Sequence, residues 1–264
     1  MNTSIDAART ALRRPRATPG VALCALLAIA LAALGASGCQ NSPKAAPSIS
    51  RAAGPEPDVR IRVGSTHDRA SFGSPATIEI DAGTFSRGWV RVQTPVTVRL
   101  SDDVWVITER SGATRRFGSV RPLKVRAADG MSVSVDGGTY AGQIELIARP
   151  AVSAGAFDVI AHVPMEKYLP GVLAKELYSD WTKGAYEAQA IAARSYAMHE
   201  RNRRMAQGHD YDLETTEMDQ VYGGDTTNRT ALAAVETTRG QVLMFRGFPL
   251  RTYYSSTCGG RPNS

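Results

Sequence analysis

The chain has 264 residues, of which 43% are hydrophobic and 21% are charged, so it can bury a hydrophobic core in one large domain or two small ones. Its formal net charge is +6, but residues 1–38 contribute four arginines against one aspartate, and the remainder carries about +3. No run of Lys or Arg in that remainder exceeds two residues, so the clustered basic surface that nucleic acid requires is not expected.

The first 38 residues have the layout of an export signal. Arg13, Arg14 and Arg16 precede an apolar run of 14 residues, 21–34, and small residues follow that run up to Cys39. A helix needs about 20 apolar residues to span a bilayer, so we predict a signal peptide over 1–38 rather than a permanent membrane span. An uncleaved signal anchor is the alternative.

Cys39 lies directly after the predicted signal peptide, in the sequence Ala-Ser-Gly-Cys. This sequence resembles the lipobox of bacterial lipoproteins, in which the cysteine becomes the lipidated N-terminus, although Ala36 stands at the place of the usual leucine. We therefore predict an exported lipoprotein that is anchored through Cys39 and faces the periplasm or the cell wall. The alternative is an ordinary cleaved signal, with Cys39 as a nearby thiol.

Few cysteines and histidines remain in the predicted folded part. Cys258 is its single cysteine, so no internal disulfide is expected, and the four histidines show no paired metal-ligand spacing. We expect neither a metal site nor a cofactor.

The segment 39–57 is rich in Pro, Ala and Ser without periodicity, which predicts a flexible tether.

From 58 to 163, short β-branched runs recur between clusters of Gly, Asp and Ser, which predicts a β-rich domain. The predicted strands cover residues 59–63, 77–80, 89–92, 96–100, 104–108, 131–135, 140–148 and 157–163. Their alternation indicates half-buried strands of a sandwich or small barrel that serves as a scaffold.

From residue 164 to residue 264 the pattern becomes mixed. We predict helices over 165–177, 182–207 and 230–238, and strands over 241–245 and 248–255. Pro170 should break or restart the first helix, because proline has no N–H to donate. Gly208 is expected to cap the second helix, whose alanines imply close packing. The predicted fold class is α+β, with a β-rich N-terminal part followed by a mixed helical and β part.

Three blocks in this second part carry a resemblance to a known family. The first reads VPMEKYLPGVLAKEL (163–177), the second AQAIAARSYA (188–197), and the third joins DQVYGG (219–224) to TRGQVL (238–243), GFPL (247–250) and YSSTCGGR (254–261). In order and spacing these blocks resemble the catalytic module of the sporulation protein D and amidase-enhancer family.

The resemblance implies a lytic transglycosylase that cuts peptidoglycan between N-acetylmuramic acid and N-acetylglucosamine and leaves a 1,6-anhydro end. The catalytic glutamate of the family falls on Glu176, which is followed here by Leu177 in place of the family's methionine. Without the resemblance, a solvated helix carboxylate is the simpler interpretation of Glu176.

One carboxylate is sufficient for this chemistry, because the sugar's own 6-hydroxyl attacks the anomeric carbon in place of water. The acid must hold its proton near neutral pH, which calls for apolar neighbours. Leu173, Leu177, Tyr178 and Trp181 are close to Glu176 in sequence and are candidates for that role.

Amide, hydroxyl, guanidinium and aromatic groups in the three blocks are candidates for glycan binding. The candidate residues are Gln189, Arg194, Gln220, Tyr222, Tyr254, Ser255 and Ser256. Arg194 has a second interpretation, slightly favoured here, as a buried ion-pair partner on a tightly packed helix. The aromatic residues have a second interpretation as core residues.

The chain departs from the family pattern in two places. Sporulation members often have Cys and His before the third block, taken as zinc ligands, whereas Glu214, Met218 and Asp219 stand at those places here, so no zinc site is expected. Family chains also typically continue beyond the last motif, whereas this sequence stops at Ser264, which suggests a C-terminally incomplete catalytic region.

The expected partners are peptidoglycan glycan strands, the membrane through the lipid anchor, and a wall amidase as a further candidate; nucleic acid is not among them. The main alternative function is a non-catalytic wall-binding or amidase-stimulating lipoprotein. A structural lipoprotein whose β-rich half binds a partner is another. The presence of Glu176 favours the enzyme.

Overall fold

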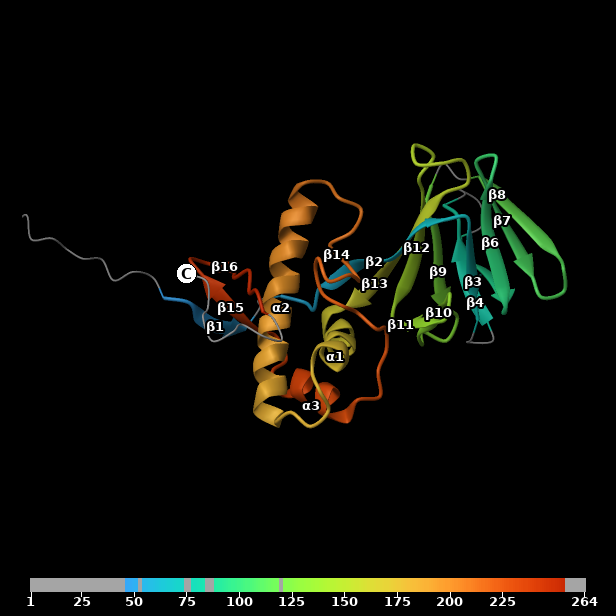
Figure 1. Ribbon diagram of the computed structural model, residues 1–264. Coiled ribbons are helices and arrows are strands. Elements are labelled where there is room, and N and C mark those ends of the chain that lie inside the picture. The colour runs from blue at the N-terminus through green and yellow to red at the C-terminus, as the bar shows by residue number, and fades with distance from the viewer. Residues whose placement is uncertain (1–45, 52–53, 74–76, 84–87, 119–120, 255–264) are drawn as a thin grey trace, which may run out of the picture. The chain divides into compact units, whose positions relative to one another are not determined.

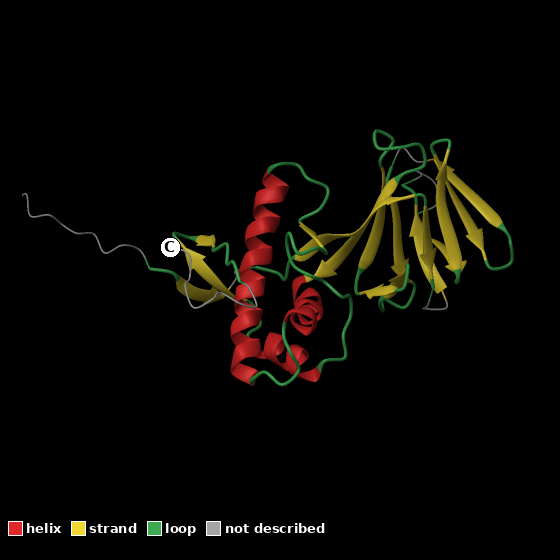
Figure 2. Ribbon diagram, viewed as in Figure 1, coloured by secondary structure: helices red, strands yellow, loops and turns green. Residues whose placement is uncertain are grey.

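The computed structural model describes residues 46–51, 54–73, 77–83, 88–118 and 121–254 (Figure 1). The predicted signal peptide, the lipidation site Cys39, and the candidate glycan-binding residues Ser255 and Ser256 lie outside the described residues. Strands dominate the first part of the described chain, and helices mixed with strands follow (Figure 2). The predicted α+β fold class is confirmed.

A seven-stranded sheet runs through the described structure in the order β14-β2-β13-β12-β9-β4-β5. Its strands are β2 (Asp58–His67), β4 (Thr77–Asp81), β5 (Val90–Gln93), β9 (Leu123–Ala127), β12 (Gln143–Ala148), β13 (Phe157–Pro164) and β14 (Leu213–Glu214). Neighbouring strands are antiparallel except for the parallel pair β14 and β2. Alternate residues of β4, β9 and β12 are buried, as a sheet with one covered face requires.

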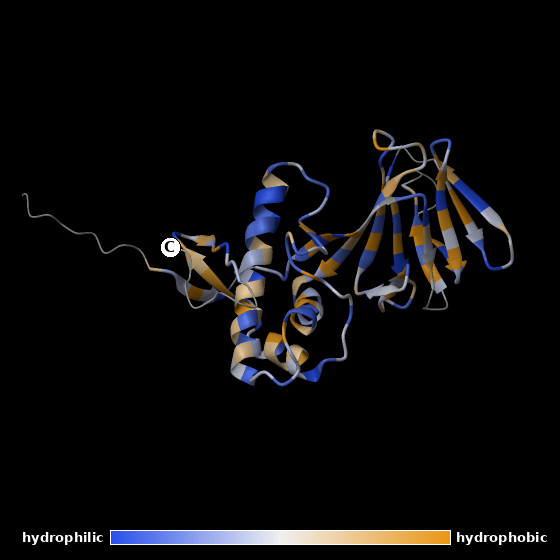
Figure 3. Ribbon diagram, in the orientation of Figure 1, coloured by the Kyte–Doolittle hydropathy of each residue, from blue (hydrophilic) through white to orange (hydrophobic). Residues whose placement is uncertain are grey.

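A six-stranded antiparallel sheet has the order β11-β10-β3-β6-β7-β8. Its strands are β3 (Arg69–Phe72), β6 (Val96–Ser101), β7 (Val104–Glu109), β8 (Thr114–Gly118), β10 (Val133–Val135) and β11 (Gly138–Tyr140). Trp105 of this sheet meets Phe157 of the seven-stranded sheet edge to face, with ring centroids 5.3 Å apart. Both sheets share one hydrophobic core, and their strands show alternating hydrophobic and hydrophilic bands (Figure 3). The architecture is therefore a sandwich.

Several strands were not predicted from the sequence. The sequence patterns missed β3, β8, β9 and β14. The predicted strand 140–148 joins the end of β11 to β12, which are separated at Gly142, whose φ of +87° breaks the extended backbone. Strand β8 is mostly exposed, so it lacks the hydrophobic alternation on which strand prediction depends. Pairing with β7 through backbone hydrogen bonds forms this strand without that signal.

Three helices follow β13 in the described residues: α1 (Met165–Glu176), α2 (Lys183–Ala206) and α3 (Arg229–Thr237). The Thr182 hydroxyl caps α2 by accepting the Ala185 N–H at 3.3 Å, and the Asn228 side chain caps α3 by accepting the Ala231 N–H at 3.0 Å. None of these helices has the length and apolar character needed to cross a membrane.

The prediction that Pro170 breaks the first helix is wrong, because α1 runs through it without interruption. Most of α1 is buried around Pro170, against α2, α3 and β13. Packing of that kind outweighs the roughly 3 kcal/mol that an internal proline costs a helix.

A small antiparallel sheet has the order β1-β15-β16, with β1 at Ser48–Arg51, β15 at Gln241–Phe245 and β16 at Phe248–Pro249. The prediction of a flexible tether is wrong over 48–51, because β1 pairs with β15 from Ser48 with Met244 to Arg51 with Gln241. The residues of β1 are all exposed, so this strand forms through its backbone pairing with the edge of β15, which lies far away in the sequence. Over the described residues 250–254 the predicted strand 248–255 is wrong, because β16 ends at Pro249 and the Leu250 N–H donates only one further hydrogen bond, to the Leu243 carbonyl at 2.8 Å.

The two parts of the described chain are joined without a linker. Strand β13 ends at Pro164, α1 begins at Met165, and β14 adds to the edge of β2. The sequence pattern changes from strand-like to helical at residue 164, but the described structure continues across this point without a linker.

Candidate functional site

Glu176 is the last residue of α1 and is half-buried. Its Oε1 accepts the backbone N–H of Val221 at 3.3 Å. Val221 belongs to the loop between β14 and α3, which carries the third sequence block. This hydrogen bond brings together the first and third blocks at the carboxylate that the resemblance identifies as catalytic.

Gln220 is the hub of a hydrogen-bond chain next to this contact, and its exposed fraction is only 1%. Its Oε1 accepts the hydroxyl of Tyr168 at 3.0 Å. Its Nε2 donates to the hydroxyl of Tyr254 at 2.8 Å and to the carbonyl of Ala193 at 3.3 Å. A single buried amide thus connects α1, α2 and the C-terminal segment.

Tyr254 lies within electrostatic reach of Glu176. Burial raises the pKa of Tyr254 above its ordinary value and the negative charge of Glu176 adds to this, while hydrogen bonds with Gln220 and Gln189 act in the opposite direction. The phenol therefore stays protonated at neutral pH and keeps its hydrogen to donate. The structure brings together Glu176, Gln189, Gln220 and Tyr254, four of the residues singled out from the sequence.

Tyr222 packs inside the structure and presents little surface. Its ring lies 4.8 Å from that of Tyr168 and 5.8 Å from that of Tyr140, measured between centroids. A Cβ at Gly171 would stand 2.6 Å from the Tyr222 ring, so this glycine lets the loop approach α1. Burial raises the pKa of Tyr222 well above its ordinary value. Of its two interpretations, we favour the core residue.

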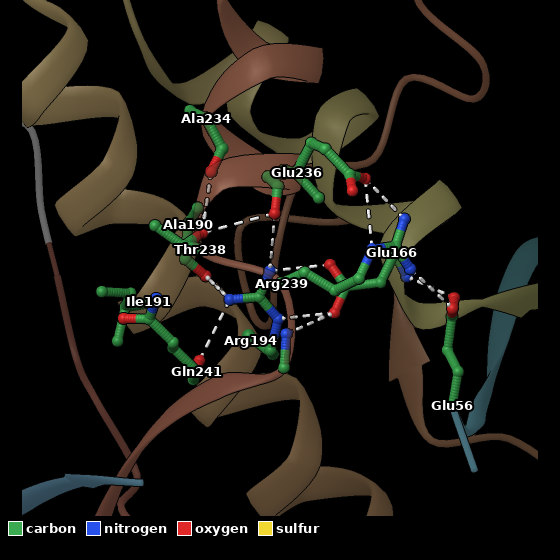
Figure 4. A network of polar contacts seen from close by, with 12 residues as sticks. Glu56, Glu166, Ala190, Ile191, Arg194, Ala234, Glu236, Thr238, Arg239 and Gln241 are labelled. Carbon is green, nitrogen blue, oxygen red and sulfur yellow. Dashed lines mark hydrogen bonds and ion pairs between the residues drawn. The ribbon is translucent and has the colours of Figure 1, made fainter. Parts of the chain in front are cut away.

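Arg194 is 1% exposed and lies in a network of polar contacts (Figure 4). Its Nε and Nη2 donate to the two carboxylate oxygens of Glu166 at 3.0 and 2.7 Å, and its Nη1 donates to the carbonyl of Gln241 at 3.0 Å. The guanidinium group of Arg194 therefore forms its hydrogen bonds with Glu166 and Gln241 of the same chain. We favour its structural interpretation over glycan binding.

The loop before the third block is held by charged side chains. Asp219 accepts the hydroxyl of Tyr196 at 3.1 Å, Nη2 of Arg204 at 2.9 Å and the N–H of Glu214 at 2.9 Å. Glu214 accepts Nη2 of Arg62 at 2.6 Å. Asp219 and Glu214 stand at two of the family's zinc-ligand places.

These residues do not fit a zinc site of the N/S kind. Both carboxylates are occupied by arginines, and Met218, at the third place, is exposed. Within the described ranges, no group of three or more His, Cys, Asp or Glu could hold a metal ion. Ion pairs stabilise the loop here.

The apolar neighbours expected around Glu176 divide into two groups. Leu173 is buried and Leu177 is half-buried, whereas Tyr178 and Trp181 are exposed. The two aromatic side chains therefore leave large parts of their surfaces open to solvent.

Sequence reasoning missed Tyr168, which holds Gln220, and Glu166, which pairs with the candidate residue Arg194. A buried arginine on an alanine-rich helix requires a carboxylate partner, so Arg194 was a signal that pointed to an acidic residue such as Glu166 in the first block. The role of Tyr168 had no signal in the sequence, because its partner Gln220 lies 52 residues away.

Comparisons with known proteins place the similarity in this part of the chain. The family described as stage II sporulation protein matches residues 153–245. An uncharacterised protein of Brachyspira hyodysenteriae is 36% identical over 107 residues, which cover 40% of this chain and 29% of that protein. The amidase enhancer of Bacillus subtilis is 36% identical over 92 residues, which cover 35% of this chain and 12% of that protein. The chain thus matches less than a third of either relative's length.

Proposed function

Since residues 153–245 belong to the family of stage II sporulation protein D and amidase enhancer, which acts at the cell wall, we propose that this chain is a peptidoglycan lytic transglycosylase with Glu176 as its general acid and base. The observation that carries the proposal is the position of the Glu176 carboxylate. It accepts the Val221 N–H and lies within electrostatic reach of Tyr254, beside the Gln220 hydrogen-bond chain.

The reaction begins with a protonated Glu176, which donates its proton to the glycosidic oxygen as the bond from that oxygen to the anomeric carbon of N-acetylmuramic acid breaks. The 6-hydroxyl of the same sugar then attacks the anomeric carbon and forms the 1,6-anhydro ring. Glu176, now a carboxylate, takes the proton of that hydroxyl and returns to its starting form. No water is consumed and no second carboxylate is required.

Gln220 and Tyr254 support the position of the acid in this proposal. The Val221 N–H at 3.3 Å fixes one carboxylate oxygen, and the adjacent Gln220 is anchored through Tyr168 and Ala193. The protonated phenol of Tyr254 offers a hydrogen to a sugar oxygen or to Glu176. A general acid must lie within hydrogen-bond reach of the oxygen that it protonates. A fixed backbone around Glu176 therefore helps to hold its carboxylate at the glycosidic oxygen.

The test is mass spectrometry of the soluble products that the chain releases from intact and denuded glycan strands. The native chain should release anhydro-disaccharides or anhydro-muropeptides, and Glu176→Gln should release none. Glu236→Gln is the matched control, because Glu236 is an exposed carboxylate on α3 whose partner is Arg239. Products with a reducing end, or equal release by Glu176→Gln, would contradict the proposal.

A non-catalytic, amidase-stimulating lipoprotein is the second candidate, and the similarity to the amidase enhancer of Bacillus subtilis favours it. Mixing the chain with a wall amidase separates the two functions. Stimulation that is equal for the native chain and Glu176→Gln, without anhydro products from either, would support this candidate. Lipid anchoring through Cys39 also remains a proposal, which mass spectrometry of the membrane-extracted protein tests.

A further inference from the structure

Two exposed aromatic side chains lie immediately after the proposed catalytic residue. Tyr178 is 71% exposed and Trp181 is 42% exposed, although both are large side chains that proteins usually cover. Their ring centroids lie 6.2 Å apart with the planes tilted by 55°, so the two rings are neighbours, and a large part of each side chain stays open to solvent.

Hydrogen bonds fix the backbone between Tyr178 and Trp181. The Trp181 N–H donates to the Tyr178 carbonyl at 3.2 Å, which closes a turn between α1 and α2. The hydroxyl of Tyr186, a fully buried residue of α2, donates to the same carbonyl at 3.2 Å. Thr182 then caps α2 directly after the turn. The structure therefore presents the two exposed rings from a fixed turn.

The turn keeps both rings close to Glu176. Consecutive Cα atoms are 3.8 Å apart, so the Tyr178 Cα lies within about 8 Å of the Glu176 Cα. The ends of a hydrogen-bonded turn lie within about 7 Å of one another, which places the Trp181 Cα within about 15 Å of the Glu176 Cα. A polymer bound at Glu176 extends beyond the cleaved bond and passes over the neighbouring surface.

We propose that Tyr178 and Trp181 form an aromatic platform that binds the sugar rings of a glycan strand next to the scissile bond. The proposal deepens the transglycosylase function and rests on it. Pyranose rings present flat C–H faces with polar rims, and Tyr and Trp combine an apolar face with a polar edge that suits such a surface. Stacking needs no charge on the sugar, so the platform takes peptide-bearing and denuded strands alike.

The test measures binding of the chain to purified, insoluble peptidoglycan by cosedimentation. All variants carry Glu176→Gln, so that the glycan is not cut during the experiment. Tyr178→Ala and Trp181→Ala should each weaken binding by roughly tenfold, while Tyr178→Phe and Trp181→Phe should restore most of it because a ring remains. Phe248→Ala is the matched control, since Phe248 is 72% exposed on β16.

Kinetics on the chain with Glu176 intact supply a second readout. Loss of either ring should raise KM more than it lowers kcat, because the platform binds substrate and transition state alike. Unchanged thermal unfolding would show that the exposed rings are not needed for folding.

The outcomes separate this inference from the proposed function. If the native chain releases anhydro products but Tyr178→Ala and Trp181→Ala bind glycan as Phe248→Ala does, the platform is overturned and the transglycosylase stands. If ring removal weakens glycan binding but no chain releases product, the platform stands and the proposed reaction fails. If ring removal abolishes stimulation of an amidase and leaves glycan binding unchanged, the rings bind a protein and the platform is overturned.

Discussion

Glu166 and Arg194 form a buried ion pair that fixes three elements at once. The Glu166 carboxylate also accepts the N–H of Gly240 at 3.1 Å, next to β15. The Glu166 backbone N–H donates to the Glu56 carboxylate at 2.9 Å. Arg194 therefore joins α2 to α1 and to the start of β15, and its charge is neutralised where water does not reach it (Figure 4).

Replacing Glu166 with Gln should lower the free energy of unfolding by about 3 kcal/mol, because it leaves the charge of Arg194 buried without a counter-ion. Urea denaturation measures this difference. Glu236→Gln removes the carboxylate of the exposed pair with Arg239 and should leave the free energy of unfolding nearly unchanged, because solvent screens that pair. Equal effects of the two substitutions would contradict a special role for the buried pair.

Gln220 and the pair of Tyr178 and Trp181 show the limit of residue-scale prediction from the sequence. The family resemblance identified Glu176 and Gln220 as candidates, but the partners of Gln220 come from α1, α2 and the C-terminal segment. Tyr178 and Trp181 were candidates for apolar neighbours of Glu176, and the structure leaves 71% of Tyr178 and 42% of Trp181 exposed. Exposure depends on what the rest of the chain places nearby, and a local pattern carries no such information.

At the scale of elements, the helices were predictable because their signals are local. Thr182 and Asn228 cap α2 and α3 through side-chain hydrogen bonds, and Gly208, with a φ of +73°, follows the end of α2. Strand β1 was not predictable, because it forms only against β15, nearly 200 residues later in the chain. Because β1 forms through backbone pairing with a distant strand, its own sequence shows no periodic hydrophobic pattern.

Strands β12 and β13 carry a cross-strand pair whose contribution depends on pH. Nε2 of His162 lies 2.8 Å from Oε2 of Glu145, and the ionised carboxylate accepts the ring N–H. This hydrogen bond is the largest cause that lowers the pKa of Glu145 below its ordinary value of 4.5; the charges of His162 and Lys124 add to it, and burial opposes it. A lowered folded-state pKa stabilises the fold above pH 4.5, and this stabilisation is lost as the pH falls through the folded-state value.

Glu145→Gln should therefore reduce stability at pH 6 to 7 and make little difference at pH 3. Urea denaturation of both chains across this range gives the difference in unfolding free energy at each pH. A difference that stays constant from pH 3 to pH 7 would show that Glu145 acts through packing and not through its charge.

At the scale of the whole molecule, the sandwich is coupled to the proposed catalytic site through the loop after α2. The Asp212 carboxylate is buried and accepts three hydrogen bonds from Arg60 of β2. The donors are the Arg60 backbone N–H at 2.9 Å, its Nε at 3.1 Å and its Nη2 at 2.6 Å. The same loop continues through Asp219 to Gln220 and Val221. The β-rich part thus anchors the segment that contacts Glu176.

Asp212→Asn should lower both stability and the rate of anhydro-product release, although residue 212 lies outside the proposed chemistry. Loss of the charge leaves Arg60 poorly paired, and a shift of the loop displaces the Val221 N–H from Glu176, so the rate per folded molecule should fall by roughly tenfold or more. Amide hydrogen exchange of residues 212–222 should increase in the same variant. Glu109→Gln breaks a more exposed ion pair with Arg115 in the six-stranded sheet and should leave both the loop and the rate unchanged. A full rate from folded Asp212→Asn would show that the sandwich stabilises the chain without positioning its site.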